Sequence, residues 1–347
     1  MPQYDAILIV SFGGPEGLDE IMPFLENVTR GRNIPRERLL EVAHHYEHFR
    51  GVSPINQQTR DMVNALRVEL ARHGPGLPIY WGNRNWHPML DGTVKRMAED
   101  GVKRAIAFVV AAYSSYSSCR QYRENIEAAR ASVGDGAPQI DKLRVFYNHP
   151  LFIKAYADHV AEAITQLPEH LRSEAKLVYT AHSIPSSMAQ TSRYEEQLRE
   201  TSRLIAENLG REDWALVYQS RSGPPTQPWL EPDVCDYLKE LKEKGEAEAV
   251  VIVPVGFLSD HMEVLYDLDM EARELCDEIG LPMVRAASVG VHPDFIRMIR
   301  DLIAERIAEP SERPAVGRYP ASHDVCPIDC CKPPQRPVAG AAHRATA

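Results

Sequence analysis

Residues 250–278 read VVIVPVGFLSDHMEVLYDLDMEARELCDE, and this segment decides the fold. Its first residues, Val250 to Val255, form an apolar run that is typical of a buried strand. A Pro-Val-Gly break follows, and the apolar spacing after it predicts a helix from about Ser259 to Glu278. The apolar face of this predicted helix comprises Leu265, Leu268, Ala272 and Leu275. The segment therefore predicts a strand followed by a helix, the repeating unit of α/β proteins.

The predicted helix also carries three carboxylates at four-residue spacing. Glu263, Asp267 and Glu271 fall on one side, because residues four apart are neighbours on a helix surface. His261 lies beside them at the start of the helix. Open α/β sheets bind their ligands at the carboxyl ends of the strands, where this row begins. Two interpretations stay open: the solvated acidic face of an amphipathic helix, or a path for a cation.

The same alternation of strands and helices runs through the rest of the chain. Further strands are predicted at residues 6–10, 79–82, 105–112, 143–147, 176–181, 214–219 and 284–287. A connector rich in Gly, Pro and Asp, at residues 134–141, separates two similar halves. We therefore predict an α/β fold with two domains, residues 1–141 and 142–308, followed by a tail at 309–347. The functional residues are expected in the cleft between the two halves.

Composition excludes several classes of protein. The chain has 347 residues and a formal net charge of −10, and it shows no basic stripe, which argues against a nucleic-acid partner. No apolar run approaches the roughly 20 residues that span a bilayer, so no integral membrane segment is predicted. The N-terminus, MPQYDAILIVSFGG, lacks the basic region of a signal peptide and is interpreted as a first strand. We expect a cytoplasmic protein.

A histidine at the end of a predicted strand is a candidate for chemistry. His182 follows the strand at 176–181 and precedes Ser183-Ile184-Pro185. Its imidazole titrates near neutral pH, so it can act as a base, although a structural histidine with satisfied hydrogen bonds fits the pattern equally well. Since His182 and Glu263 both follow strands of the second half, we expect them to face each other.

Cysteines are concentrated in the tail, at Cys326, Cys330 and Cys331, within the sequence CPIDCC. In a reducing compartment this spacing favours metal ligation over disulfides, with free thiols in an unstructured tail as the alternative. A fourth ligand must come from elsewhere. Cys119 lies in a predicted loop and is the better candidate, because Cys235 and Cys276 lie within predicted helices and are expected to pack there.

Several motifs together resemble those of the ferrochelatase family. They are SFGGP (11–15), TRGR (29–32), GVSPI (51–55), SSYSSCRQY (114–122), TAHSIP (180–185), YQSRSGPPTQPWLEPD (218–233) and GFLSDHMEVLYDLD (256–269). The resemblance covers nearly the whole chain. It implies two Rossmann-like domains, each with a parallel four-stranded sheet flanked by helices, with the porphyrin in the cleft between them.

The resemblance also implies roles for individual residues. His182 matches the active-site histidine and Glu263 its partner carboxylate; the two carry metal delivery and pyrrole deprotonation, and which does which stays open. Asp267 and Glu271 match an acidic path for metal or protons. The positions that match macrocycle contacts are Arg30, Ser53, Tyr122 and Phe12. Phe12 departs from relatives with an iron-ligating tyrosine there, because phenylalanine offers no ligand atom.

Cys119 and the tail resemble actinobacterial ferrochelatases that carry a [2Fe–2S] cluster, which implies Cys119, Cys326, Cys330 and Cys331 as cluster ligands. Those enzymes are metal-inserting lyases of haem biosynthesis that place Fe²⁺ in coproporphyrin III. We therefore expect coproporphyrin III and Fe²⁺ as substrates, with transient contacts to other haem-pathway enzymes. The alternatives are a protoporphyrin IX ferrochelatase, a chelatase for another tetrapyrrole, and a non-catalytic porphyrin or haem carrier with an iron–sulfur sensor.

Overall fold

The computed structural model describes residues 3–31, 34–223 and 226–333. Parts of two motifs, Arg32 of TRGR and residues 224–225, lie outside the described residues, as does the end of the tail from residue 334. Among the described residues no helix is both long enough and apolar enough to cross a membrane.

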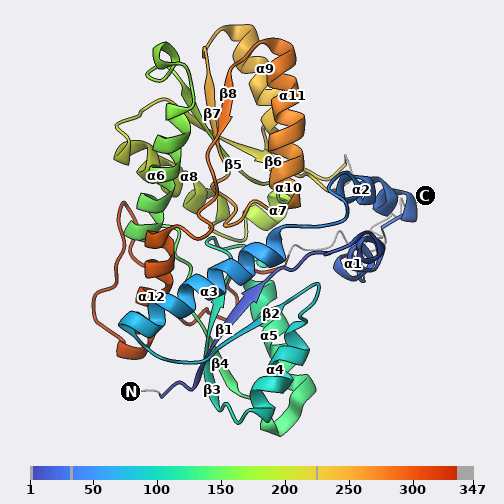
Figure 1. Cartoon of the computed structure of the whole chain (residues 1–347), viewed down its shortest axis with the longest axis vertical. Coiled ribbons are helices and arrows are strands. Elements are labelled where there is room, and N and C mark those ends of the chain that lie inside the picture. The colour runs from blue at the N-terminus through green and yellow to red at the C-terminus, as the bar shows by residue number, and fades with distance from the viewer. Residues whose placement is uncertain (1–2, 32–33, 224–225, 334–347) are drawn as a thin grey trace, which may run out of the picture.

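Two four-stranded sheets form the centres of two halves (Figure 1). Their strand orders are β2-β1-β3-β4 and β6-β5-β7-β8, and every neighbouring pair is parallel. The strands are β1 (Ala6–Ser11), β2 (Ile79–Asn83), β3 (Arg104–Val109), β4 (Gln139–Lys142), β5 (Lys176–His182), β6 (Trp214–Gln219), β7 (Val250–Val253) and β8 (Met283–Arg285). The predicted class, α/β with two parallel four-stranded sheets flanked by helices, is confirmed.

Helices cover both faces of each sheet. The longer ones are α1 (Ile21–Val28), α2 (Arg36–His48), α3 (Ile55–His73), α4 (Leu90–Glu99), α5 (Gln121–Val133), α6 (Pro150–Thr165), α8 (Tyr194–Asn208), α9 (Val234–Lys244) and α12 (Pro293–Ala308). Short helices and turns are η1 (Leu18–Glu20), η2 (Tyr116–Arg120), η3 (Gly134–Gly136), η4 (Glu169–Leu171), α7 (Ser186–Ala189), α10 (Met262–Val264), η5 (Leu265–Ala272) and α11 (Arg273–Ile279). Successive side chains of a strand point to opposite faces of the sheet. In β1, Ile7 and Ile9 therefore pack in the core that includes α3, and Leu8 packs in a second core with α4 and α5.

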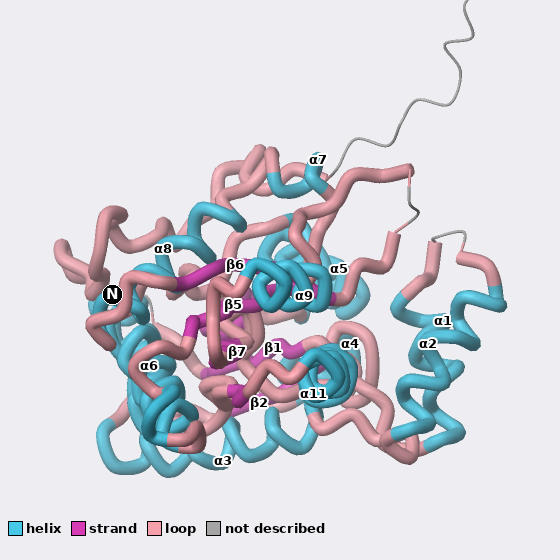
Figure 2. Tube along the Cα trace, turned by 90° about the horizontal axis from the view of Figure 1, so that it is seen from above, coloured by secondary structure: helices cyan, strands magenta, loops and turns pink. Residues whose placement is uncertain are grey.

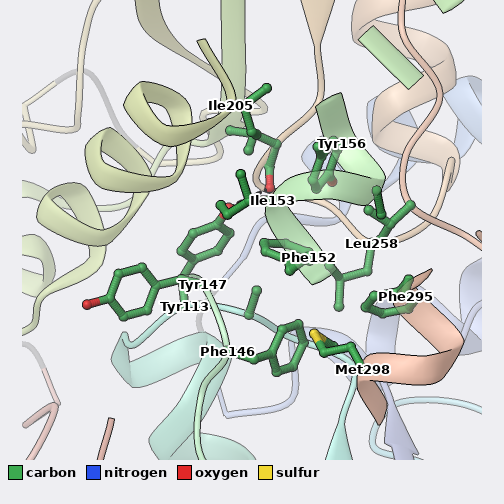
Figure 3. Close-up of a cluster of buried hydrophobic side chains, with 14 of the residues drawn as sticks. Tyr113, Phe146, Tyr147, Phe152, Ile153, Tyr156, Ile205, Leu258, Phe295 and Met298 are labelled. Atoms are coloured by element: carbon green, nitrogen blue, oxygen red, sulfur yellow. Dashed lines mark hydrogen bonds between the residues drawn. The ribbon is translucent and has the colours of Figure 1, made fainter. Parts of the chain in front are cut away.

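One apolar core runs through both halves. Phe146 lies 5.3 Å from Phe108 of β3, ring centre to ring centre, and it also contacts Phe152 and Phe295 from the second half. Figure 3 shows the rings of Phe146, Phe152 and Phe295 close to one another in this core. Helix α12 packs against α3 of the first half as well as against α6. The two halves are therefore joined by a common core.

The predicted border between the halves differs from the structure. Strand β4 (Gln139–Lys142) lies inside the predicted connector and pairs with β3, so a border at 141/142 cuts a strand of the first sheet. The strand predicted at residues 143–147 is absent from the described structure, because its apolar side chains are buried in the common core without strand pairing. β4 was missed because an edge strand reading QIDK carries only one apolar residue.

The helix after β7 also differs from its prediction. It begins at Met262, not Ser259, and its middle, η5, has the wider turns of a π-helix. The buried line is Val264, Leu268, Ala272 and Cys276; Leu265 and Leu275 remain partly exposed. A wider turn places residues four apart closer to one line than an α-helix does. The same geometry aligns the carboxylates at positions 263, 267 and 271.

Helices α1 and α2 form a small unit of their own, which Figure 2 shows beside the rest of the molecule. Phe24 on α1 packs against Tyr46 on α2 and against Trp86 of the first half. The core of this unit is separate from the common core. One side of α2 faces the segment after β7, so this unit borders the candidate site.

Candidate active site and cysteine site

The structure brings His182 and Glu263 together. His182 is the last residue of β5, and its Nε2 lies 3.7 Å from Oε1 of Glu263. Glu263 lies in α10, one loop beyond β7, and not at a strand end as predicted. The loop passes close to β5: a Cβ on Gly256 would lie 2.6 Å from the Cα of Ala181. A glycine is therefore needed where the chain turns toward His182.

Hydrogen bonds orient the histidine ring. Nδ1 of His182 lies 2.5 Å from the carbonyl oxygen of Ser183, and a carbonyl can only accept, so Nδ1 carries the proton. In the neutral ring Nε2 then presents its lone pair toward Glu263. Two acceptors that face each other at this distance favour a proton or a metal ion between them. The side chains are 32% and 46% exposed, so both are accessible.

Asp267 continues the site along η5. Its carboxylate accepts hydrogen bonds from the hydroxyl of Ser220 and from Nε2 of Gln219, the latter at 3.2 Å. Burial, and then the negative charge of Glu263, raise the pKa of Asp267 to about 7, against those hydrogen bonds. Nε2 of Gln219 also donates to the carbonyl of Glu263 at 3.1 Å. Ser220 and Gln219 were missed from the sequence, because their role appears only when β6 lies beside η5.

The row of carboxylates is distinct from the acidic residues that support the fold. Burial and the charges of Asp233 and Glu274 raise the pKa of Glu271. Asp269, on the same helix, is bonded at both oxygens to Arg285 of β8, at 2.6 and 2.8 Å. Among the described residues no Lys or Arg forms an ion pair with Glu263, Asp267 or Glu271. A cation that enters the row therefore meets no ammonium or guanidinium group already paired with these three carboxylates in the part of the chain that the structure describes.

Residues of the first half border this site. The amide of Gln58, on α3, bonds both the backbone N–H and the carbonyl of Asp260, at 2.8 and 3.2 Å. His45 of α2 stacks on Tyr266 of η5 with ring centres 3.8 Å apart. Burial and the charge of Glu263 raise the pKa of Tyr46. The His182–Glu263 pair thus lies where the two halves meet.

The four residues predicted to contact the macrocycle differ in exposure. Arg30 is exposed, just after α1, and Phe12 is half-buried. Ser53 and Tyr122 are each only 4% exposed. Arg84, which was not predicted, lies with its guanidinium 5.8 Å from the ring centre of Phe12 and 5.2 Å from that of Tyr122. Arg84 links these two rings and is an additional cation on this side of the fold.

Four of the six cysteines meet at one pocket. Cys119 of η2 and three tail residues, Cys326, Cys330 and Cys331, line it together. The Sγ atoms of Cys330 and Cys331 are 3.6 Å apart. A hydrogen bond from Cys326, and the charge of Lys142, hold the pKa of Cys119 well below its usual range. Cys235 and Cys276 pack in the core of the second half, as predicted.

The pocket also has a cationic lining, formed by Arg120, Arg123 and Lys142. His323, which was not predicted, lies with Nε2 4.0 Å from Sγ of Cys330, so an imidazole is available beside the thiols. Cys330 and Cys331 also line a second cavity of about 720 Å³.

Asp158, His292 and Asp294 form a second group of side chains that could hold a metal ion. Lys154 contacts both of its carboxylates. An ammonium group therefore already supplies the positive charge there, and the group is interpreted as structural.

Two solved chelatases share this arrangement of sheets. SirB from Bacillus subtilis with Fe³⁺ aligns with a TM-score of 0.55 over 88% of this chain and 98% of that chain, at 12% identity. CbiX, described as the terminal enzyme of sirohaem biosynthesis in denitrifying bacteria, aligns with a TM-score of 0.52 over 86% and 98%, at 15% identity. The fold is therefore that of the two-domain chelatases.

The family model described as Ferrochelatase matches residues 4–307. The ferrochelatase of Rhodopirellula baltica is 55% identical over 98% of this chain and 97% of its own length. The coproporphyrin III ferrochelatases of Streptomyces coelicolor and Mycolicibacterium smegmatis are 48% and 49% identical, over 97% and 90% of this chain and 96% and 95% of theirs. The chain belongs to the ferrochelatase family of metal-inserting enzymes.

Proposed function

We propose that this protein inserts Fe²⁺ into coproporphyrin III to give the iron porphyrin in haem biosynthesis. The relatives named coproporphyrin III ferrochelatase, which match nearly the whole chain, support this substrate. The observation that carries the reaction is the approach of His182 to Glu263 across 3.7 Å. A carrier needs neither a base nor a metal-delivering carboxylate at the same point, so this pair favours catalysis.

The two side chains divide the chemistry of insertion. Placing Fe²⁺ in a free-base porphyrin breaks two pyrrole N–H bonds, and both protons must leave as the Fe–N bonds form. The Nε2 lone pair of His182 can accept a pyrrole proton, as a general base does. Glu263 is a hard oxygen ligand that holds Fe²⁺ without retaining it, because one carboxylate and one imidazole are a weak ligand set. Either group can serve in the other role, and both lie within reach of one reacting centre.

Asp267 and Glu271, which follow Glu263 along the helix, provide a route away from the porphyrin. Asp267 has a pKa of about 7, so it exchanges protons readily at neutral pH. Glu271 lies one turn further along the helix and is exposed. We infer that protons leave, or Fe²⁺ arrives, along Glu271, Asp267 and Glu263. The absence of a cation partner for this row among the described residues supports that use.

Contacts with the macrocycle remain a proposal for Arg30, Ser53, Tyr122 and Phe12. Arg30 is exposed and cationic, so it is suited to a propionate of the substrate. Ser53 and Tyr122 expose little surface, so their contribution is expected through shaping the wall behind Phe12. Phe12 offers an apolar face and no ligand atom, so any axial contact with iron must come from His182 or another group.

We propose that Cys119, Cys326, Cys330 and Cys331 hold a [2Fe–2S] cluster. Four thiols around one pocket are the donor set that such clusters use, and the cationic lining suits an anionic cluster. When bound, the cluster supplies a one-electron redox centre. Cys119 lies on the body and the other three on the tail, so ligation by all four ties the tail to the first half.

The test of this function is an anaerobic insertion assay with Fe²⁺ and each of two porphyrins, coproporphyrin III and protoporphyrin IX. The expected result is faster metallation of coproporphyrin III, with Arg30→Ala raising KM for that porphyrin more than for protoporphyrin IX, which has two fewer carboxylates. Preference for protoporphyrin IX would overturn the substrate assignment while leaving the family membership intact.

A further inference from the structure

We propose that Arg120 and Arg123 are positioning residues that dock the cysteine loop, residues 326–331, on the body of the protein and so gather its thiols beside Cys119. The proposal depends on the cluster assignment above in one respect only, that the gathered thiols serve as cluster ligands. The docking itself is carried by hydrogen bonds that involve no sulfur atom.

The two arginines bond the backbone of the loop. Nη1 of Arg120 donates to the carbonyls of Ile328 and Cys330, at 3.2 and 3.3 Å. Nη1 of Arg123 donates to the carbonyl of Cys326 at 3.4 Å. Each of these carbonyls belongs to a cysteine or lies between the cysteines. The arginines therefore fix the position of the loop without using its ligand atoms.

The arginines also lie on the turn that carries the fourth cysteine. Cys119 and Arg120 are consecutive in η2, and Arg123 follows on the first turn of α5. Ser115 caps this turn by accepting a bond from the N–H of Ser118 at 3.0 Å. A salt bridge from Nε of Arg120 to Glu124, at 2.9 Å, orients the guanidinium. One local element thus presents both a thiol and the donors that bring the other thiols to it.

The rest of the tail is held by similar bonds from the second half. Asn148 donates to the carbonyl of Tyr319 at 2.8 Å, and Glu200 accepts from the N–H of Arg318 at 2.6 Å. Beyond the cysteines, Thr191 donates to the carbonyl of Lys332 at 3.1 Å. These contacts hold the chain on either side of the loop. Among the described residues of the first half, where Cys119 is, Arg120 and Arg123 are the side chains that bond the backbone of the loop.

The experiment measures the reactivity of Cys119 in protein freed of metal with a chelator and reductant. Cys119 is 5% exposed, so its alkylation requires the loop to lift. We expect the R120Q/R123Q variant to alkylate at Cys119 about tenfold faster than the wild type, because three charge-assisted bonds are lost. The matched control is Arg130→Gln: Arg130 is on the same helix and donates to the carbonyl of Pro138 at 2.8 Å, away from the tail.

The second readout is the content of iron and acid-labile sulfide after reconstitution, with the visible spectrum. Wild type and Arg130→Gln are expected to load alike, and the double variant to load less. If Cys119 in the metal-free double variant were alkylated as slowly as in the wild type, the docking role would be overturned. If the wild type itself takes up no iron or sulfide, the cluster assignment fails, and the alkylation measurement still decides the docking. Should the double variant not fold, Arg123→Gln alone, which removes a single bond, gives the same comparison.

Discussion

Nε2 of His182 lies 3.7 Å from Oε1 of Glu263, although the two residues belong to different strand–helix units of the second half. Parallel strands end at the same edge of a sheet, and β5 and β7 are neighbours, so residues that follow them meet there. The tight passage of Gly256 beside Ala181 brings the second unit close enough for the side chains to converge. The reaction centre is therefore a consequence of strand order.

Asp267→Asn is expected to stabilise the protein at neutral and higher pH. Burial raises the pKa of this carboxyl from 3.8 to about 7, so the folded state binds the proton more tightly than the unfolded state. Stability from this group is therefore complete below about pH 4 and is lost as the pH rises to about 7. Above pH 7 the variant should exceed the wild type by about 1–3 kcal/mol, less than the pKa shift alone would give because the charge-assisted bonds weaken.

Urea denaturation of both proteins at pH 4 and pH 8 measures this difference. If the wild type and the Asp267→Asn variant had the same free energy of unfolding as each other at pH 4 and also at pH 8, Asp267 would have an ordinary pKa in the folded protein. Since Asp267 is also placed in the proton route, its replacement should lower the insertion rate, so a gain in stability accompanies a loss of activity.

Gln58→Ala is expected to cost about 1–3 kcal/mol, because two backbone groups of Asp260 lose their partner. It should also lower kcat, since Gln58 holds the loop that carries Glu263. The neighbouring Gln57 provides the control, because it is exposed and its side chain bonds Asp61 and Arg60 of its own helix, not the loop. A thermal melt of Gln58→Ala that coincides with that of Gln57→Ala would mean that this contact does not secure the loop.

Arg144→Leu is expected to destabilise the protein by about 3–5 kcal/mol, because the buried carboxylate of Glu305 loses both of its close hydrogen bonds and keeps Arg313, 4.0 Å away, as a more distant cationic neighbour. Arg144 is fully buried and bonds both oxygens of Glu305, at 2.6 and 2.9 Å. Replacing Arg38, whose ion pair with Glu41 is exposed, should change stability by no more than about 1 kcal/mol. Chemical denaturation compares the two, and similar costs would contradict the burial argument.

Cys330→Ser is expected to remove the visible absorption of the cluster and to lower the melting temperature, because the tail loses its tie to the body. Cys235→Ser, in the core of the second half, should leave the absorption unchanged. Unaltered absorption in the Cys330 variant would show that Cys330 is not a cluster ligand, and His323 would then be the next candidate.

The sequence predicted the elements that depend on local pattern. Buried runs such as residues 214–219 became strands at those bounds, because apolar β-branched and aromatic residues there are typical of a strand between two helical layers. The spacing of Cys326, Cys330 and Cys331, with Cys119 chosen over the helical cysteines, anticipated the thiols that meet at one pocket.

Contacts between distant segments could not be predicted in this way. The π-helical turns of η5 moved the buried line from Leu265 to Val264, since the residue period of a helix is not encoded in the apolar pattern alone. The bonds of Gln58 to Asp260 and of Arg120 to the tail depend on how elements pack. Both involve side chains on helix surfaces, where the sequence pattern indicates only exposure.

The measurement that tests the central claim most directly compares wild type, His182→Ala and Glu263→Gln in anaerobic metallation of coproporphyrin III, with porphyrin binding followed by fluorescence. The account predicts that both variants bind the porphyrin with little change while the insertion rate falls by about 10²–10⁴-fold. Insertion at the wild-type rate in either variant would contradict the assignment of the pair. Tight binding without turnover in the wild type would make this protein a porphyrin carrier.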